Sequence, residues 1–372
     1  MNRAALLLAV LLLPMCFASV PEEAGDAAEA LIASVDLSDW DEWFQKNTEE
    51  IPFKPSDFLQ RTVNAEQSND PDAWKQTALA VVLPSLKAAI KYGILFLGLA
   101  VLASVLRGLD SSSATAETAQ IAFRAIASTA VLLVVFTEIR SASLVLKRIT
   151  NTSEVLLPIL LGYLTLGGME HSAAAIAPLF SLLSDLVLNV FSRIVVPLAA
   201  IGGVLLALDV SENGTLHPIG RMLIRGAKWI LATVCSVFLL FSVFRGATAG
   251  SADGFLLKTA KLAAGGIPAV GGVVTESVET AYQCLMLVKN ALGFSAAALL
   301  VLIALKPVLS ATLMRFALRG ASALCEPISG RPYAELLRGL SDTVQVIVLA
   351  ELASLAMSLF ALSPVFGVGR FS

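Results

Sequence analysis

Residues 194–208 read IVVPLAAIGGVLLAL, fifteen positions without an ionisable side chain. Residues 292–305, LGFSAAALLVLIAL, are a second stretch of this kind, and similar segments follow one another from 80 to 365 with short polar turns between them. The chain has a mean hydropathy of +0.79, with 56% apolar and only 15% charged residues. A soluble domain of this size needs more charge to cover its surface. We therefore expect an all-α, polytopic transmembrane protein, which excludes most classes of soluble enzyme.

The first eighteen residues have the pattern of an export signal. Arg3 provides a short basic start, residues 4–13 are apolar throughout, and Cys16 and Ala18 place small residues at the −3 and −1 positions of a cleavage site. The alternative is an uncleaved first membrane helix, but the apolar stretch is shorter than the roughly 20 residues that a span needs. We therefore predict that residues 1–18 are a signal peptide cleaved near Ala18.

An acidic segment follows the signal and differs in composition from the rest of the chain. Residues 19–75 contain 14 acidic and four basic residues, whereas residues 76–372 contain 15 acidic and 21 basic ones. Residues 36–50, DLSDWDEWFQKNTEE, predict an amphipathic helix with Trp40, Trp43 and Phe44 on one face. We expect an exported acidic segment over residues 19–80 and a polytopic membrane domain over residues 81–372.

The hydropathy pattern indicates six to eight crossings, several of them short or broken by proline or glycine. A cleaved signal places the turn near Arg107 inside the cell. The predicted loop with Arg140, Lys147 and Arg148 then falls outside, against the positive-inside tendency. Either that loop is an interfacial helix or one of the neighbouring spans does not cross. The candidate spans are 86–106, 119–137, 153–169, 173–192, 194–210, 228–244, 291–312 and 342–362.

Polar residues recur at helical spacing inside or beside the apolar segments. Because ionisable groups at membrane depth are costly, such stripes face protein or water. They predict either a water-filled path or subunit contact, or hydrogen bonding between helices of one protomer. Lys306 either reaches a lipid headgroup or pairs with Glu351. The four stripes are Ser181, Asp185, Asn189 and Arg193; Glu276, Glu279, Gln283 and Asn290; Arg315, Arg319 and Ser322; and Glu351, Ser354 and Ser358.

No sequence motif indicates catalysis or a cofactor. The chain has no P-loop, HExxH, GxSxG or GxGxxG motif. Its cysteines are widely spaced, and His171 and His217 each stand alone in a polar turn. Gly246, Gly250 and Gly254 are spaced four apart, as in a helix-packing motif, but Ser251 and Asp253 between them favour a glycine-rich turn. We expect a protein that is not an enzyme, with no cofactor, no metal site and no nucleic-acid partner.

Residues 245–293, RGATAGSADGFLLKTAKLAAGGIPAVGGVVTESVETAYQCLMLVKNALG, carry a family resemblance. They resemble the stage III sporulation protein AE family of endospore-forming bacteria, through features that include Asp253-Gly254, the Lys258–Lys261 stretch, Ile267-Pro268 and Lys289-Asn290. The signal, the acidic segment with its tryptophans and the polytopic domain fit the same plan. Over residues 150–225, only hydropathy supports the likeness.

The resemblance implies a role in endospore formation. It implies a membrane component, in the mother-cell membrane around the forespore, of a secretion-like channel complex that joins mother cell and forespore and is needed for late forespore gene expression. Its implied partners are other membrane and ring-forming proteins and a partner ATPase. The alternatives are a stand-alone small-solute permease and a purely structural membrane scaffold. The residues that we expect to act in assembly or to line a path are Asp253, Lys258, Lys261, Pro268, Glu276, Glu279, Gln283 and Asn290.

Overall fold

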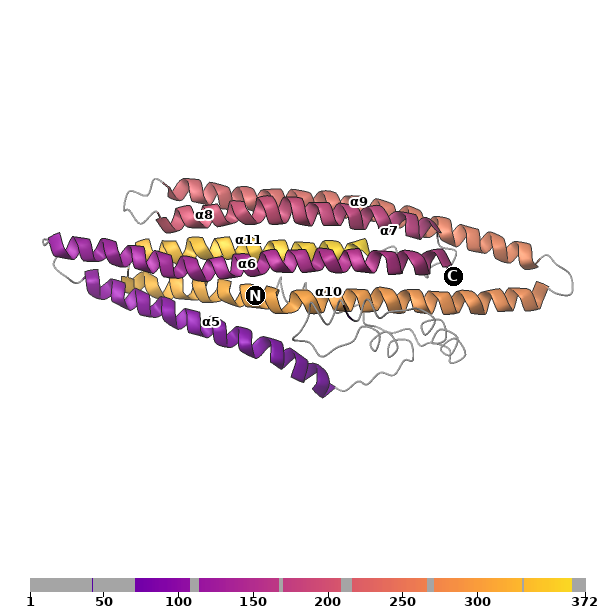
Figure 1. Cartoon of the computed structure of the whole chain (residues 1–372), viewed down its shortest axis with the longest axis horizontal. Helices are drawn as coiled ribbons and strands as arrows, with labels where there is room; N and C mark the ends of the chain where they lie inside the picture. Colours follow the sequence, from indigo (N-terminus) through magenta and orange to yellow (C-terminus); the bar gives the residue numbers. More distant parts are fainter. Residues whose placement is uncertain are drawn as a thin grey trace.

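The protein is a bundle of long helices in the part of the chain that the structure describes (Figure 1). The computed structural model describes Glu42 and residues 71–107, 114–166, 170–208, 216–265, 271–329 and 331–362. Within these residues there are helices and no strands, as the apolar segments predict. The helices are α5 Pro71–Arg107, α6 Ala114–Leu166, α7 Glu170–Asp185, the π-helix η2 Leu186–Val195, α8 Val196–Leu208, α9 His217–Gly265, α10 Gly271–Ser329 and α11 Arg331–Ala361. The predicted signal peptide and almost all of the acidic segment lie outside the described residues.

Six apolar stretches of these helices are long enough to cross a membrane, which falls within the predicted range of six to eight. Two pairs of predicted spans are joined into continuous helices. The predicted spans 119–137 and 153–169 both belong to α6, and 173–192 and 194–210 both belong to the run from α7 to α8. The six stretches are Leu83–Val105, Ile121–Gly162, Ile176–Leu208, His217–Phe241, Ala296–Pro327 and Tyr333–Ala361.

The predicted loop around Arg140 is instead the middle of α6. Arg140, Lys147 and Arg148 are exposed, while Leu146 and Ile149 are fully buried on the other face of the same helix. A hydropathy window averages these two faces and reports a polar interruption. The helix continues because its buried positions keep a spacing of three and four residues. The conflict with the positive-inside tendency disappears, since these three residues do not form a loop.

The helices are much longer than a bilayer is thick. Helix α6 has 53 residues and α10 has 59, which correspond to lengths of about 80 and 90 Å at 1.5 Å per residue. The hydrocarbon core of a membrane is about 30 Å thick. Figure 1 shows the end of α9 and the start of α10 extending past the other helices at one end of the bundle. These two helices therefore reach beyond any single membrane that the bundle crosses.

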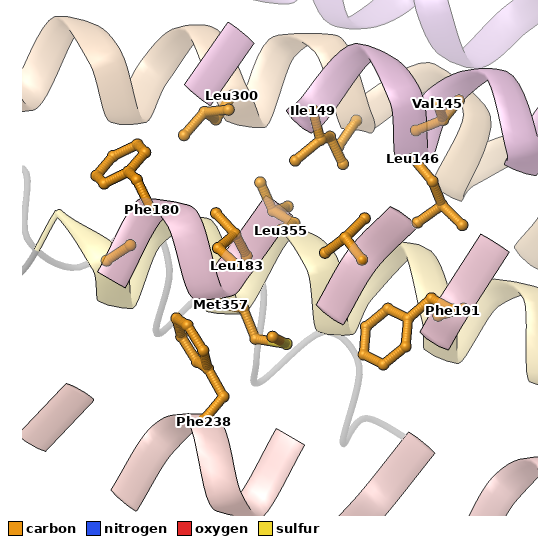
Figure 2. Close-up of a cluster of buried hydrophobic side chains, with 14 of the residues drawn as sticks. Val145, Leu146, Ile149, Phe180, Leu183, Phe191, Phe238, Leu300, Leu355 and Met357 are labelled. Atoms are coloured by element: carbon orange, nitrogen blue, oxygen red, sulfur yellow. The ribbon is translucent and has the colours of Figure 1, made fainter. Parts of the chain in front are cut away.

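Two apolar cores hold the bundle together. The larger one joins the second half of α6 to α7, η2, α8, α9 and parts of α10 and α11. Figure 2 shows its side chains converging, with Met357 of α11 near Phe238 of α9 and Leu183 of α7. The smaller core joins α5, the first half of α6, the second half of α10 and the first part of α11 around Phe96 and Leu318. Each core contributes apolar burial that fixes the relative positions of the helices.

Glycines allow α8 to pack closely against its neighbours. A Cβ atom on Gly202 would lie 2.8 Å from Ile224 Cγ1 and 2.9 Å from the carbonyl oxygen of Gly220 on α9. A Cβ atom on Gly203 would lie 2.9 Å from Thr343 Oγ1 on α11. The Gly202-Gly203 pair is therefore a close-packing site inside a continuous helix, of the kind that small residues form between membrane helices. It is not the helix interruption that the sequence indicates.

Candidate functional site

Seven of the eight residues expected to act in assembly or to line a path lie on the two projecting helices. Asp253, Lys258 and Lys261 belong to the last part of α9, which remains helical through Gly246, Gly250 and Gly254 to Gly265. The expected glycine-rich turn at these positions is therefore wrong. Glu276, Glu279, Gln283 and Asn290 belong to the first part of α10. Pro268, and the side chains of the other seven residues, lie outside the described part.

The structure thus divides residues 258–290 between two helices, and the charges of this stretch would make a single lipid-facing span costly. Helix α9 ends at Gly265 and α10 begins at Gly271. The apolar stretches found on these helices end at Phe241 and begin at Ala296. About 35 Å of helix lies beyond the apolar stretch on each of them, at 1.5 Å per residue. Most of residues 245–293, the stretch that carries the family resemblance, therefore lies in one helical projection of the bundle.

A polar stripe faces outward on the run from α7 to α8. Ser181, Asp185, Asn189 and Arg193 are all exposed, whereas Val187 and Phe191 of the same turns are fully buried. The π-helix η2 keeps the two sets apart. Four residues turn slightly more than once around an α-helix and slightly less than once around a π-helix. The stripe therefore moves one way around the axis along α7 and the other way along η2.

If the run from α7 to α8 crosses a membrane, part of this polar stripe must lie inside the membrane. Between His171 and Asp209 the only ionisable residues are Asp185 and Arg193, and the longest uncharged stretch is residues 194–208. A crossing of about 20 residues includes at least one of the two. A charge at the centre of a bilayer costs about 2.5–3.5 kcal/mol on insertion scales. An exposed charge at this depth therefore favours contact with water or with another protein over contact with lipid.

The stripe on the last helix has the opposite orientation. Glu351, Ser354 and Ser358 are at most 1% exposed, and the hydroxyl of Ser358 donates to the carbonyl oxygen of Ser354 at 2.9 Å. Lys306 is exposed on α10. Arg319–Asp342 and Arg338–Glu326 are ion pairs, whereas no ion pair between Lys306 and Glu351 is observed among the described residues. This stripe belongs to the interior of the protomer.

A second buried carboxyl group, Glu138 of α6, is missing from the sequence prediction. Glu138 is 8% exposed, and the hydroxyl of Ser310 on α10 donates to its Oε1 atom at 3.4 Å. The sequence places it at the end of an apolar span, beside an assumed loop. Its true position follows from the buried positions Val131, Val135, Ala142 and Leu146, which continue the helical spacing through residue 138.

Basic residues of α9 and α10 meet at one level of the bundle, beside polar partners on α11. Lys228 of α9 donates to Gln345 Oε1 of α11 at 2.8 Å, and Arg319 of α10 lies 3.5 Å from Asp342 of α11. The charge of Arg315 acts on Lys228 across the helix interface. Lys228 and the predicted basic stripe of Arg315 and Arg319, which are far apart in the sequence, therefore lie close together. Ser322, the last member of the predicted basic stripe, is buried instead and donates to the carbonyl oxygen of Ala334 at 2.8 Å.

No group of three or more histidine, cysteine or acidic side chains is placed to hold a metal ion among the described residues. Cys235 and Cys325 are both free thiols. The hydrophobic bundle with its six apolar stretches, its buried carboxyl groups and its outward polar stripe defines a multi-pass helical membrane protein.

Comparison with known proteins places the chain within that class. The family model for stage III sporulation protein AE matches residues 53–369. Stage III sporulation protein AE of Bacillus subtilis (strain 168) is 25% identical over 349 residues, which cover 91% of this chain and 87% of that protein. No solved structure matches the chain. The chain belongs to the stage III sporulation protein AE family, which confirms the resemblance drawn from residues 245–293 and gives the protein a role in sporulation.

Proposed function

We propose that this protein is a membrane subunit of a multiprotein, secretion-like channel complex between mother cell and forespore, and that late forespore gene expression needs it. The observation that carries the proposal is the family match over residues 53–369. In this proposal the protein resides in the mother-cell membrane around the forespore. It supplies a membrane path or its frame and is not an enzyme, and a partner ATPase provides any energy input.

The direction of the bundle supports a specific arrangement of this subunit. Cleavage of the signal near Ala18 places the start of α5 outside the mother-cell cytoplasm. Successive helices then alternate in direction, so that the α9–α10 projection lies on the outer side, facing the forespore. The opposite end carries Arg221, Arg225 and Arg319, as the positive-inside tendency requires of a cytoplasmic end. In this arrangement the projection meets the ring-forming partners between the two membranes.

The outward polar stripe favours a subunit over a self-sufficient permease. A permease that holds a small solute within its own helices needs its polar groups to face a path inside the bundle. Here Asp185, Asn189 and Arg193 face out of the bundle, where a neighbouring subunit can satisfy them. Reconstitution of the purified protein alone separates the two functions, because a permease transports solute without partners and a channel subunit does not.

The decisive genetic test uses the polar stripe on the projection. The double variant Glu276→Lys plus Glu279→Lys is expected to lower spore yield strongly while the protein still inserts, because it reverses two charges on the proposed assembly surface. The matched control, Glu22→Lys plus Glu23→Lys, reverses two charges in the acidic segment and is expected to sporulate normally. Both are compared at equal membrane abundance. Normal sporulation by the 276/279 variant would remove this stripe from the function and favour the scaffold.

A further inference from the structure

Two carboxyl groups lie where the two apolar cores meet. On α6, Val135 belongs to the smaller core and Leu146 to the larger one, with Glu138 between them. On α10, Ala304 belongs to the larger core and Ala311 to the smaller, with Ser310 beside the boundary. Glu351 occupies the corresponding place on α11, where Val348 belongs to the smaller core and Leu355 to the larger. Three helices therefore bring polar side chains to the boundary between the two apolar cores.

Glu351 is deeply buried, and no ion pair with it occurs among the described residues. It is 1% exposed, and its Oε2 atom has no hydrogen-bond partner within the part of the chain that the structure describes. Ser354, one turn further along the same helix, is 0% exposed, and its hydroxyl also has no hydrogen-bond partner. Glu138 is close enough for its charge to act on Glu351. An ionised carboxylate in such surroundings costs several kcal/mol unless it is paired.

The basic groups nearest along the packed helices do not supply that pairing. Arg140 on α6, Arg193 on η2 and Lys306 on α10 are exposed. Lys228 on α9 is bonded to Gln345.

The next titratable group of α9, Cys235, packs against the sulfur of Met357, and α8 has no ionisable residue. The acids Asp185 and Asp342 add no positive charge, and Lys87 and Lys91 of α5 are exposed. Two negative charges within one apolar interior repel each other.

We propose that Glu138 and Glu351 form a proton-binding site at the centre of the bundle, which holds at least one proton at neutral pH. The proton converts a buried carboxylate to a neutral carboxylic acid and removes the repulsion between two negative charges. The hydroxyl of Ser310 donates to Glu138, and Ser354 lies one turn beyond Glu351 on α11. Loss of the proton leaves two negative charges in the interior, which disfavours the packing of α6 against α11. Proton occupancy is thereby linked to the packing of the junction between the two cores.

Infrared spectroscopy of the full-length protein reconstituted in lipid tests this site directly. At neutral pH the wild-type protein is expected to show a carbonyl band from a protonated carboxylic acid, which shifts in D2O. Glu351→Gln and Glu138→Gln are each expected to remove or shift that band, because each takes away one of the two carboxyl groups of the site. The matched control is Glu335→Gln, an exposed glutamate of α11, which is expected to leave the band unchanged.

Each other outcome overturns the proposal. A wild-type spectrum without the band shows that both carboxyl groups are ionised, and this measurement needs no variant to fold. A band that persists unchanged in both glutamine variants places the proton elsewhere in the chain. If the band is absent and sodium or potassium ions raise the thermal stability of wild type but not of Glu351→Gln, the site binds a metal cation in place of a proton.

Discussion

Replacing Gly202 by alanine is expected to force α8 and α9 apart. The new methyl group would lie 2.9 Å from the carbonyl oxygen of Gly220, whereas ordinary contacts begin at 3.4 Å. The helices therefore have to separate by about half an ångström at this point, and overpacking of this kind typically costs about 1–3 kcal/mol. The backbone oxygen cannot rotate away as the end of a flexible side chain can. We expect Gly202→Ala to lower the free energy of unfolding by this amount relative to a glycine-to-alanine control.

The control is Gly320→Ala on α10, where an added Cβ meets nothing within 4 Å. It carries the same gain in helix propensity, about 0.5–1 kcal/mol, without the collision. The free energies are measured by titrating SDS into detergent micelles of the full-length protein while near-ultraviolet circular dichroism follows tertiary packing. The difference between the two variants isolates the strain.

A double variant sharpens the test, because the contact between Gly202 and Gly220 is reciprocal. A Cβ atom on Gly220 would lie 2.8 Å from the carbonyl oxygen of Gly202. One separation of α8 from α9 relieves both collisions, so Gly202→Ala plus Gly220→Ala is expected to cost less than the sum of the single variants. The reasoning is refuted if Gly202→Ala is as stable as Gly320→Ala, or if the two single effects add.

Two further predictions concern the N-terminus and the α9–α10 projection. Mass spectrometry of the purified protein is expected to show the loss of residues 1–18, and an intact Met1 terminus would contradict the assignment of a cleaved signal. Cysteines introduced singly at positions 276, 279 and 283 are expected to react with water-soluble thiol reagents in the isolated protein, because charge at these positions is too costly in lipid. If none of them reacts, the stripe is packed against protein and does not face water.

The membrane class and the family were predictable from short-range sequence patterns. Long apolar segments such as 194–208 indicate a membrane protein because the free energy of transfer into lipid is a sum over single residues. That sum can be made without knowing which residues are neighbours in space. The family-like stretch 245–293 is recognised from its local order of residues. The division of residues 258–290 between two helices also follows from local polarity, because each buried charge adds its own cost.

The helix boundaries were less predictable, since a hydropathy average cannot separate two faces of one helix. Arg140 and Lys147 lower the average of the middle of α6, although they lie on its exposed face. The same averaging hid Glu138, which looks like the end of a span but lies on the buried face. The spacing of buried residues across 131–149 contains the missing signal, and it becomes readable once the helix is taken as continuous.

The sequence by itself determined that this chain is helical, apolar enough for a bilayer and a member of a sporulation family, because composition and local order settle these properties. Only the tertiary structure decided which polar stripe faces in and which faces out. Glu351, Ser354 and Ser358 point into the bundle, whereas Asp185, Asn189 and Arg193 point out of it, although both sets have similar helical spacing. The direction of a stripe depends on which neighbours cover its helix, and α6, which carries the buried Glu138 and packs against α11, lies far away in the sequence.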